Sequence, residues 1–316
     1  MIIRDMHFHT TFSDWIKTNG EVFDEVRWLL KEWQEAFIVP TEHDIFNETL
    51  TDLFRENWIG STYWTEISAY DNIWKKSLHL TFYTDKISRE IKEILDNTRN
   101  AKIEKIKGQI DLLETNWFEI NYSDFIEYYT KKWANIENLN SYHIKKYIYN
   151  NDENKTKILN IVNNNNEDNK KIDIEEVNFI KEFLKPDWKH KSYWYAERER
   201  YEPHIEALWE VMTKKEWLFL AHPNFTFKDN YKWFYEFIEN YKKTITWIEI
   251  NSTASKEWVE KITEVCEENN FIITFWSDSH WEKEDEFHWK LWSINPHISE
   301  ELVEEHHKKF LKKLGR

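Results

Sequence analysis

Two histidines near the start of the chain, His7 and His9, lie two residues apart, and Asp14 follows them. An apolar, strand-like run at residues 2–9 carries both histidines, and a spacing of two directs their side chains to the same face of an extended strand. Two imidazoles beside a carboxylate provide half of a metal site. Because barrel enzymes place their chemistry at strand ends, we expect the other half to come from the ends of further strands.

Residues with metal-binding side chains occur near one end of almost every other strand-like run. The candidate ligands are His43, Glu66, His79, His222, Asp278 and His280, and the candidates to support them are Asp44, Glu249 and Asn251. One histidine near a strand end is more often a structural residue than a ligand. Six histidines, one glutamate and two aspartates placed in this order instead predict a site for more than one ion at the mouth of a barrel.

Seven short runs of apolar, β-branched or aromatic residues predict strands, and most are followed by a stretch with helical periodicity. The predicted strands are residues 2–9, 36–40, 63–68, 78–83, 217–221, 244–250 and 271–275. The predicted helices are residues 21–35, 86–115, 122–132, 204–214, 231–241, 255–269 and 300–314. Alternating helices and almost continuously apolar strands predict parallel pairing, and seven strands predict a barrel or a barrel-like sheet.

The alternation is interrupted between the fourth and fifth predicted strands. Residues 85–195 have a helical pattern, are charged and are rich in Asn, most densely at residues 150–155 and 163–170. This segment predicts an inserted helical subdomain with a flexible, exposed stretch at about residues 150–170. The barrel domain is then discontinuous, at residues 1–84 and 196–316. The insertion is a candidate lid, because strand-to-helix loops of a barrel lie over its active face.

The chain is acidic, with 43 Lys and Arg against 58 Asp and Glu and a net charge of −15. This argues against a protein that coats nucleic acid, and a small anionic substrate would need a local positive source such as bound metal ions. The single Cys266 excludes an internal disulfide and a Cys-based zinc site, and its helical setting predicts a core thiol. Strand-like sequence from residue 2, and no apolar run of about 18 residues, predict a cytoplasmic protein without a membrane partner.

Glycine and tryptophan occur in unusual amounts, 4 and 19 of 316 residues, whereas glycine is normally about 7% of a sequence. Tryptophan also stands where turn and helix-end chemistry favours glycine, at Trp15, Trp117, Trp133, Trp276 and Trp281. We hypothesise that the source organism reads the UGA codon as glycine and that these positions are glycine in the native protein. The alternative is a protein that is truly rich in tryptophan.

In their order along the chain, these motifs resemble the PHP family, named for polymerase and histidinol phosphatase. The motifs are His7-Phe-His9, Ser13-Asp14, Glu42-His43-Asp44, Glu66-Ile-Ser, an isolated His79, Ala-His222-Pro and Ser-Asp278-Ser-His280. The resemblance covers roughly residues 1–84 and 196–295 and implies a distorted seven-stranded (β/α)7 barrel with metal-dependent phosphoric ester hydrolysis. The chain differs at Trp15, Trp64, Trp276 and Trp281, where the family usually has glycine and real tryptophans would crowd the mouth.

The resemblance also implies how the ligands are shared. In a site of this family, the first ion would be held by His7, His9, Glu66 and Asp278, the second by Glu66, His79 and His222, and the third by Asp14, His43 and His280. Imidazoles and carboxylates without thiolates suit two or three divalent ions and do not choose sharply among Mn, Zn and Fe. Such ions clamp phosphate oxygens and lower the pKa of a bound water, which is the chemistry of phosphoester hydrolysis.

The insertion is similar to that of the branch containing nucleoside 3′,5′-bisphosphate phosphatases and ribonuclease AM. The similarity lies at Arg99-Asn-Ala-Lys102, at residues 112–120 and at Ser141-Tyr-His143-Ile. Arg99 and Lys102, three residues apart on one predicted helix face, and His143 are candidate substrate contacts, although the first two are equally typical of solvated helix charges.

These observations predict an enzyme that hydrolyses phosphomonoesters of nucleotides or short oligonucleotides at a di- or trinuclear metal site. The expected partner is that small phosphorylated substrate or short oligonucleotide. The alternatives are a histidinol-phosphate-type phosphatase and a non-catalytic metal- or nucleotide-binding module of the same fold.

Overall fold

The computed structural model describes residues 3–13, 17–30, 35–132, 134–164, 172–184, 202–213, 216–277 and 295–315. The chain divides into two units. One is made of Met1–Asp96 and Glu202–Arg316, and the other of Asn97–Tyr201. We call them the barrel unit and the insertion unit. Helix α3, Arg89–Thr115, begins in the barrel unit and continues into the insertion unit.

Seven strands form one sheet in the barrel unit, in the order of the chain. They are β1 (Ile3–Phe8), β2 (Ala36–His43), β3 (Tyr63–Asp71), β4 (Lys76–Thr84), β5 (Glu216–Leu220), β6 (Ile245–Asn251) and β7 (Ile272–Trp276). Four neighbouring pairs are parallel, but β4 runs antiparallel to both β3 and β5. The prediction of parallel pairing is therefore wrong for β4. Only residues 72–75 join β3 to β4, and so short a link permits a hairpin but not the crossover that a parallel pair needs.

The sheet curls into a nearly closed barrel whose first and last strands meet. Asp5 of β1 accepts hydrogen bonds from the backbone N of Ser277 at 3.3 Å and from its hydroxyl at 2.7 Å, directly after β7. Both residues are fully buried. The predicted distorted (β/α)7 barrel is thereby confirmed, with helical sequence inserted between β4 and β5.

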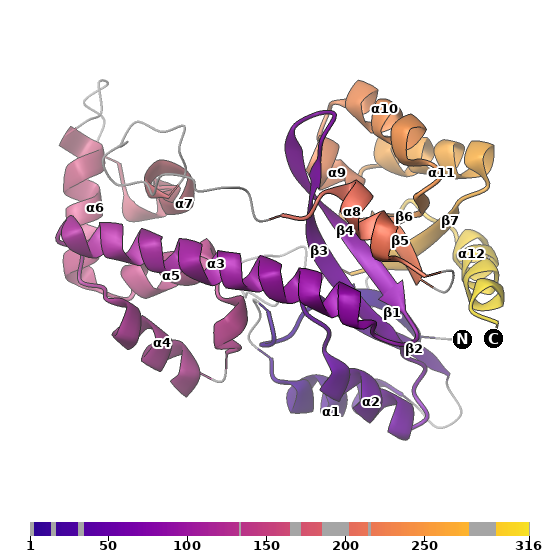
Figure 1. The fold of residues 1–316 in the computed structure, drawn as a ribbon, viewed down its shortest axis with the longest axis horizontal. Coiled ribbons are helices and arrows are strands. Elements are labelled where there is room, and N and C mark those ends of the chain that lie inside the picture. The colour runs from indigo at the N-terminus through magenta and orange to yellow at the C-terminus, as the bar shows by residue number, and fades with distance from the viewer. Residues whose placement is uncertain are drawn as a thin grey trace. The chain divides into compact units, whose positions relative to one another are not determined.

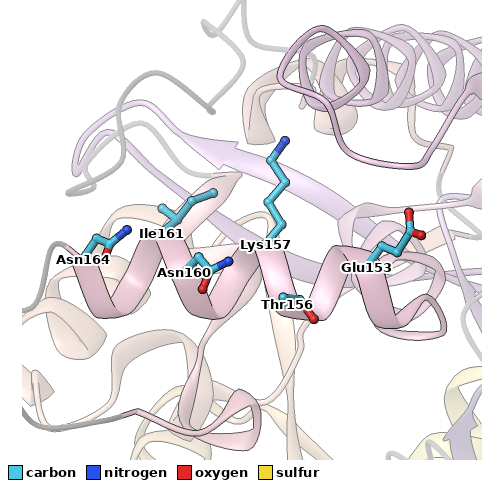
Figure 2. A pocket seen from close by; sticks show the side chains of 6 residues that line it. All are labelled: Glu153, Thr156, Lys157, Asn160, Ile161 and Asn164. Atoms are coloured by element: carbon cyan, nitrogen blue, oxygen red, sulfur yellow. The ribbon is translucent and has the colours of Figure 1, made fainter.

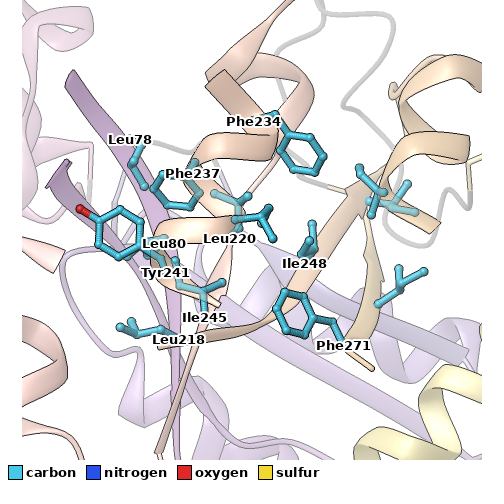
Figure 3. Packing of buried hydrophobic residues seen from close by; sticks show 14 of the residues in the cluster. Leu78, Leu80, Leu218, Leu220, Phe234, Phe237, Tyr241, Ile245, Ile248 and Phe271 are labelled. Carbon is cyan, nitrogen blue, oxygen red and sulfur yellow. The ribbon is translucent and has the colours of Figure 1, made fainter. Parts of the chain in front are cut away.

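Helices cover the outside of this barrel (Figure 1). They are α1 (Asn19–Leu29), α2 (Glu48–Glu56), α8 (Ile205–Val211), α9 (Pro223–Phe227), α10 (Tyr231–Tyr241), α11 (Lys256–Asn269) and α12 (Glu300–Lys313). α1 and α2 pack on β1 and β2 through one apolar cluster. A larger cluster joins β4, β5 and β6 to α10 and α11 (Figure 3). Cys266 of α11 is buried in that cluster, which confirms the predicted core thiol.

Aromatic rings fill the barrel interior near the N-terminal end of β3. Trp64 of β3 and Trp247 of β6 are buried, and both pack against Phe219 of β5 at centroid distances of 4.7 and 4.5 Å. Phe310 of α12 contacts both tryptophans as well. Trp64 precedes Glu66 by two residues, so it faces the same side but lies nearer the start of the strand. A tryptophan at position 64 therefore packs below the mouth and does not crowd it.

The insertion unit has its own apolar core, which includes Phe118, Phe179 and Phe183. Besides most of α3, it contains α4 (Tyr122–Lys131), α5 (Ser141–Tyr149), α6 (Asp152–Asn164), α7 (Phe179–Phe183) and the 3-10 turns Ile136–Asn138 and Ile174–Glu176. We expected a flexible, exposed stretch at about residues 150–170, but Asp152–Asn164 within it form helix α6. Asn154, which is 1% exposed, accepts a hydrogen bond from Glu119 N at 2.8 Å and donates one to Glu119 O at 3.1 Å, so it ties the helix to the unit.

Two helices end on a tryptophan in the left-handed backbone region. Trp58 after α2 has φ 63° and Trp117 after α3 has φ 67°, and their side chains are 97% and 84% exposed. The amide of each tryptophan and of the next residue donates into the last helical turn at 2.9 to 3.2 Å, which is the Schellman arrangement that favours glycine. Asn270 and Gly315 occupy left-handed helix ends in the same chain, with φ 55° and 71°. Among the described residues, no helix combines the length and apolar composition needed to cross a bilayer.

Candidate metal centre

Glu66 of β3 is the residue on which histidines from four other strands converge. It is 1% exposed. Its Oε2 atom lies 3.2 Å from His7 Nε2, 3.4 Å from His9 Nε2 and 3.1 Å from His43 Nδ1. The Nε2 atoms of His7 and His9 are 3.2 Å apart, and the rings of His9 and His43 stack at 4.5 Å. Three imidazoles therefore face one oxygen of this carboxylate.

The other oxygen of Glu66 faces a second group of histidines. Its Oε1 atom lies 2.6 Å from His79 Nδ1 and 2.7 Å from His222 Nε2, and these two nitrogens are 3.3 Å apart. Two sets of potential ligand atoms, each within 4.8 Å of one another, share the carboxylate: His7, His9 and Glu66, and His43, Glu66 and His79. Glu66 is thus placed to bridge two cations.

Strand direction explains why these side chains meet at one end of the barrel. His9 and His43 lie at the C-terminal ends of the parallel strands β1 and β2, and His43 is in register with Glu66 of β3. Because β4 runs the opposite way, its start lies at this same end, where His79 is in register with Ser68. The antiparallel strand, which the sequence pattern did not predict, is what brings an early residue of β4 to the mouth.

His222 stands at a sharp change of backbone direction between β5 and α9. Its φ of 28° and ψ of 65° fall outside the usual regions for a residue with a side chain. Pro223 begins α9 directly after it, and the amide of the preceding Ala221 donates to His79 O at 3.2 Å. Such conformations cluster at functional sites, where the surrounding structure holds them in place. Here the turn aims the imidazole at Glu66.

The charges around Glu66 leave room for a cation. Burial alone would lower the pKa of His7, but the carboxylates of Glu66 and Glu249 outweigh it and raise that pKa to about 10. Burial alone would raise the pKa of Glu66, but the surrounding histidines, His43 first among them, hold it well below its usual range. In the absence of an ion, protons on the imidazoles supply the positive charge that this buried carboxylate requires. A divalent ion bound by neutral imidazoles fits the same place and the same charge.

Glu249 of β6 lies behind His7, as the sequence predicted for a supporting residue. Glu249 is fully buried. Its Oε1 atom accepts a hydrogen bond from the Thr81 hydroxyl at 2.6 Å, and the same atom lies 3.6 Å from His7 Nδ1. Its Oε2 atom has no hydrogen-bond partner among the described residues, and burial raises its pKa. Asp44, another predicted support, accepts hydrogen bonds from Ser68 N at 2.9 Å and from the Ser68 hydroxyl at 3.0 Å. Its contact with a ligating histidine stays a prediction.

A second buried carboxylate next to the site, Glu42, received no role from the sequence. It lies on β2 beside His43 but on the opposite face, where it accepts a hydrogen bond from the Ser13 hydroxyl at 2.6 Å. Ser13 in turn lies 3.2 Å from His9 Nδ1. The available signal was strand alternation, which places Glu42 behind the candidate ligand His43 rather than in the mouth.

The remaining predicted site residues divide into two groups. Asp14, Asp278 and His280 lie outside the described residues, as do Trp15, Trp133 and Trp281. Within the insertion unit, Arg99 is 3.9 Å from Glu137 Oε2 and 11% exposed, and Lys102 is half-buried.

His143 of the insertion unit is largely buried. The backbone N of Asn140 donates to its Nδ1 atom at 3.1 Å, so it caps α5, and its ring packs edge-on against Tyr129 at 4.9 Å. These contacts give His143 a structural role, and its contact with substrate stays a prediction.

A shallow groove of about 410 Å³ runs along α6 in the insertion unit (Figure 2). Its lining consists of Glu153, Thr156, Lys157, Asn160, Ile161 and Asn164. The Lys157 ammonium donates to Asn116 O and lies 5.0 Å from the centre of the Phe118 ring. The groove contains none of the histidines or carboxylates described above, so we do not assign the chemistry to it.

Comparison with solved structures finds two proteins that share the fold over almost the whole chain. A protein from Bifidobacterium adolescentis, assigned as a metal-dependent phosphoesterase, matches with a TM-score of 0.64 and 18% identity over 99% of this chain and 98% of that one. An amidohydrolase from Chromobacterium violaceum, solved with bound sulfate and no metal, matches with a TM-score of 0.64 and 15% identity over 97% and 96%. No family model matches the sequence, and no curated protein matches it. At these identities the likeness establishes a shared fold.

Proposed function

We propose that this protein is a metal-dependent phosphoesterase that hydrolyses phosphomonoesters of nucleotides or short oligonucleotides. One observation carries the proposal: the Glu66 carboxylate divides its two oxygens between two sets of imidazoles at the mouth of the barrel. The shared fold with a protein assigned as a metal-dependent phosphoesterase supports it, and so does the ordered set of motifs that resembles the PHP family.

The residues present fit two divalent ions, such as Mn, Zn or Fe. His7 and His9 with Glu66 would hold one ion, and His79 and His222 with the other oxygen of Glu66 would hold the second. Bound there, the ions supply positive charge against phosphate oxygens and a water of lowered pKa. A third ion at Asp14, His43 and His280 stays a prediction, as do the substrate contacts of Arg99, Lys102 and His143.

The chain's own residues explain how such a site would be kept ready. Glu66 is held by its neighbours as an ionised carboxylate, so it requires no proton transfer before it binds an ion. Barrel strands rather than long loops carry His7, His43, Glu66 and His79, which fixes their spacing. His222 adds a ligand from a strained turn, and its ring is therefore directed at Glu66 before any substrate arrives.

A substrate panel with defined metal content tests the proposal. Protein purified without chelators is analysed for metal and then assayed with added manganese on nucleoside 3′,5′-bisphosphates, 5′-phosphorylated oligoribonucleotides, histidinol phosphate and an amide substrate. We expect release of phosphate from the nucleotides. His222→Ala should lower turnover at least about a hundredfold while leaving the circular dichroism spectrum and melting curve largely unchanged.

The other outcomes separate the alternatives. Turnover confined to histidinol phosphate would identify the alternative phosphatase, and turnover confined to the amide would replace phosphoester chemistry. Bound metal without turnover on any substrate, also in a variant with glycine at the doubtful tryptophan positions, would identify a binding module. Unchanged turnover in His222→Ala would contradict its role as a ligand.

We also propose that UGA is read as glycine in the source organism, with Trp117, already singled out by sequence, and now Trp58 as its best-supported sites. Both combine a left-handed backbone with an exposed side chain, and large side chains rarely adopt that conformation. Mass spectrometry of the protein isolated from its source should find glycine at both positions. Intact tryptophan at 58 and 117 would contradict the recoding.

We further propose that the protein is cytoplasmic. Its partner is then a small phosphorylated substrate or a short oligonucleotide. The net charge of −15 supports the second part, because a broad nucleic-acid surface would be repelled. Fractionation of the source cells tests the location.

A further inference from the structure

The ring of His9 is engaged at both of its nitrogens. Nε2 faces the cluster, 3.2 Å from His7 Nε2 and 3.4 Å from Glu66 Oε2. Nδ1 faces away from it, 3.2 Å from the hydroxyl of Ser13. His9 and Ser13 are 0% and 1% exposed, so bulk water does not compete for these contacts. A neutral imidazole offers a lone pair on one nitrogen only, and the hydrogen on the other decides which one can bind an ion.

The proton of the Ser13 hydroxyl is already committed elsewhere. It is donated to Glu42 Oε2 at 2.6 Å. Glu42 is fully buried and also accepts from Thr10 N at 3.0 Å, from the Thr10 hydroxyl and from Asn47 Nδ2 at 2.9 Å. All four contacts are donors, so both oxygens of Glu42 act as acceptors. Since a hydroxyl has a single proton, Ser13 can only accept a hydrogen from His9 Nδ1.

We propose that Ser13 and Glu42 form a positioning relay that fixes His9 as an Nε2 ligand. Glu42 takes the Ser13 proton, Ser13 takes the hydrogen bond from His9 Nδ1, and the lone pair of Nε2 is left directed at the cluster. Neither residue of the relay needs to touch the ion or the substrate. The inference deepens the proposed function, because the ion that Nε2 would bind belongs to the proposed metal centre.

The substitution Glu42→Gln tests the relay with little change in shape. A glutamine amide keeps one accepting oxygen in place of two, and when its nitrogen faces Ser13 the Ser13 proton is released to point at His9 Nδ1. We expect the neutral form of His9 to change from the Nδ1–H to the Nε2–H tautomer. We also expect the affinity for manganese or zinc to fall about 10- to 100-fold, as for other residues that orient a metal ligand. Long-range proton–nitrogen NMR of the metal-free protein over a range of pH reads the tautomer, with the signal assigned by its loss in His9→Gln, and competition with a chelator reads the affinity.

Matched variants separate the relay from a general loss of packing. Glu216→Gln replaces another buried carboxylate, one at the start of β5 that accepts from Thr213 N at 2.6 Å, and it should change neither reading. Ser13→Ala should lower the affinity about tenfold, whereas Ser13→Thr keeps the hydroxyl and should restore both readings. If Glu42→Gln does not fold, the Ser13 pair decides: equal affinities for alanine, threonine and wild type would overturn the relay.

A folded Glu42→Gln protein with the Nδ1–H tautomer and wild-type affinity, together with wild-type affinity in Ser13→Ala, would overturn the relay as well. Failure of the proposed function looks different. Wild-type protein that binds metal with His9 in the Nδ1–H form, but hydrolyses no phosphoester, would support the relay and contradict the phosphoesterase. Wild-type protein that binds no metal would contradict the metal centre, and the tautomer of His9 in Glu42→Gln would still decide on the relay.

Discussion

Glu66 shows how much chemistry a single buried residue can organise. Removing a carboxylate from water costs several kcal/mol unless positive charge or hydrogen bonds replace the lost solvent. At Glu66 that replacement comes from five histidines within 3.4 Å of its oxygens. The same arrangement that makes the buried charge tolerable also presents a bridging ligand with imidazoles on both sides. Either protons on the imidazoles or a bound cation would supply the positive charge that this carboxylate requires.

Competition between protons and metal predicts a pH dependence. In the metal-free protein the pKa of His7 is about 10, and an ion can bind only to the neutral imidazole. The apparent affinity should therefore rise about tenfold per pH unit from pH 7 and level off near pH 10. The folded metal-free protein shows the opposite trend, because the stabilisation from a raised pKa is present below the unfolded value of 6.5 and is lost as the pH rises to about 10.

Titration calorimetry at several pH values measures this affinity, and His7→Gln is the control. In that variant the affinity should be lower overall and its dependence on pH weaker. A wild-type affinity that is constant between pH 7 and 10 would contradict the coupling between His7 protonation and metal binding.

Two tryptophans should respond in opposite ways to the same substitution. Trp117→Gly relieves a left-handed backbone and exposes nothing that was buried, so it should stabilise the protein by about 0.5–1 kcal/mol. Trp64→Gly removes a side chain that is 1% exposed among Tyr83, Phe219 and Phe310, and should cost about 4 kcal/mol. Urea unfolding of both variants measures the difference. Stabilisation by Trp64→Gly would instead place position 64 among the recoded glycines.

Among the elements, α12 is attached to the sheet by an unusual hydrogen bond. The Nδ1 atom of His306 accepts from the backbone N of Ile273 in β7 at 3.0 Å. His306 is 4% exposed, and burial, together with the charge of Lys309, lowers its pKa to about 4. The neutral imidazole is therefore part of the fold, because a proton on Nδ1 would remove the acceptor.

This attachment predicts a loss of stability in mild acid. A lowered pKa means that the stabilisation is fully present above the unfolded value of 6.5 and is lost as the pH falls to about 4. A shift of this size is linked to about 3 kcal/mol. His306→Asn keeps an acceptor oxygen near the position of Nδ1 but does not titrate, so its unfolding free energy should fall less over this range. Equal acid sensitivity of wild type and His306→Asn in urea titrations at pH 7 and pH 4.5 would count against the prediction.

At the scale of the whole molecule, the barrel depends on contacts between the two ends of the chain. The Ser277 hydroxyl donates to Asp5 Oδ2 at 2.7 Å, across 272 residues of sequence, and Asp5 also accepts from His7 N at 3.3 Å. Ser277→Ala leaves the buried carboxylate with one donor fewer and should destabilise the protein by about 1–3 kcal/mol. Because Asp5 also holds the backbone of His7, we expect the metal affinity to fall as well. A matched control is Ser68→Ala, which removes a hydroxyl of β3 that donates to Asp44, directly after β2. Wild-type stability and affinity in Ser277→Ala would show that the barrel closes without this bond.

Much of the fold could be predicted because hydrophobic periodicity is a local property. The strand-like runs fall on the seven strands, and the predicted helix at residues 231–241 matches α10. Helix α2 was missed although it is amphipathic, because its nine residues are fewer than the roughly 11–18 over which helical periodicity is judged. The antiparallel direction of β4 was missed because parallel pairing was inferred from the alternation of strands and helices. The short link between β3 and β4, which permits only a hairpin, was the signal that should have been used.

The sequence by itself determined which residues have metal chemistry and that they follow strands, because residue type and spacing are written along the chain. It identified His7, His9, His43, Glu66, His79 and His222, which the structure brings together. The resemblance to the PHP family implied that two ions share Glu66. Only the tertiary structure decided which imidazoles face each oxygen of Glu66 and that Glu42 reaches His9 through Ser13. Several of those relations join residues far apart in the sequence, 29 positions for Ser13 with Glu42 and 156 for Glu66 with His222, so they depend on strand order, register and the face on which each side chain lies. These quantities are set by packing of the whole barrel, and no local pattern records them.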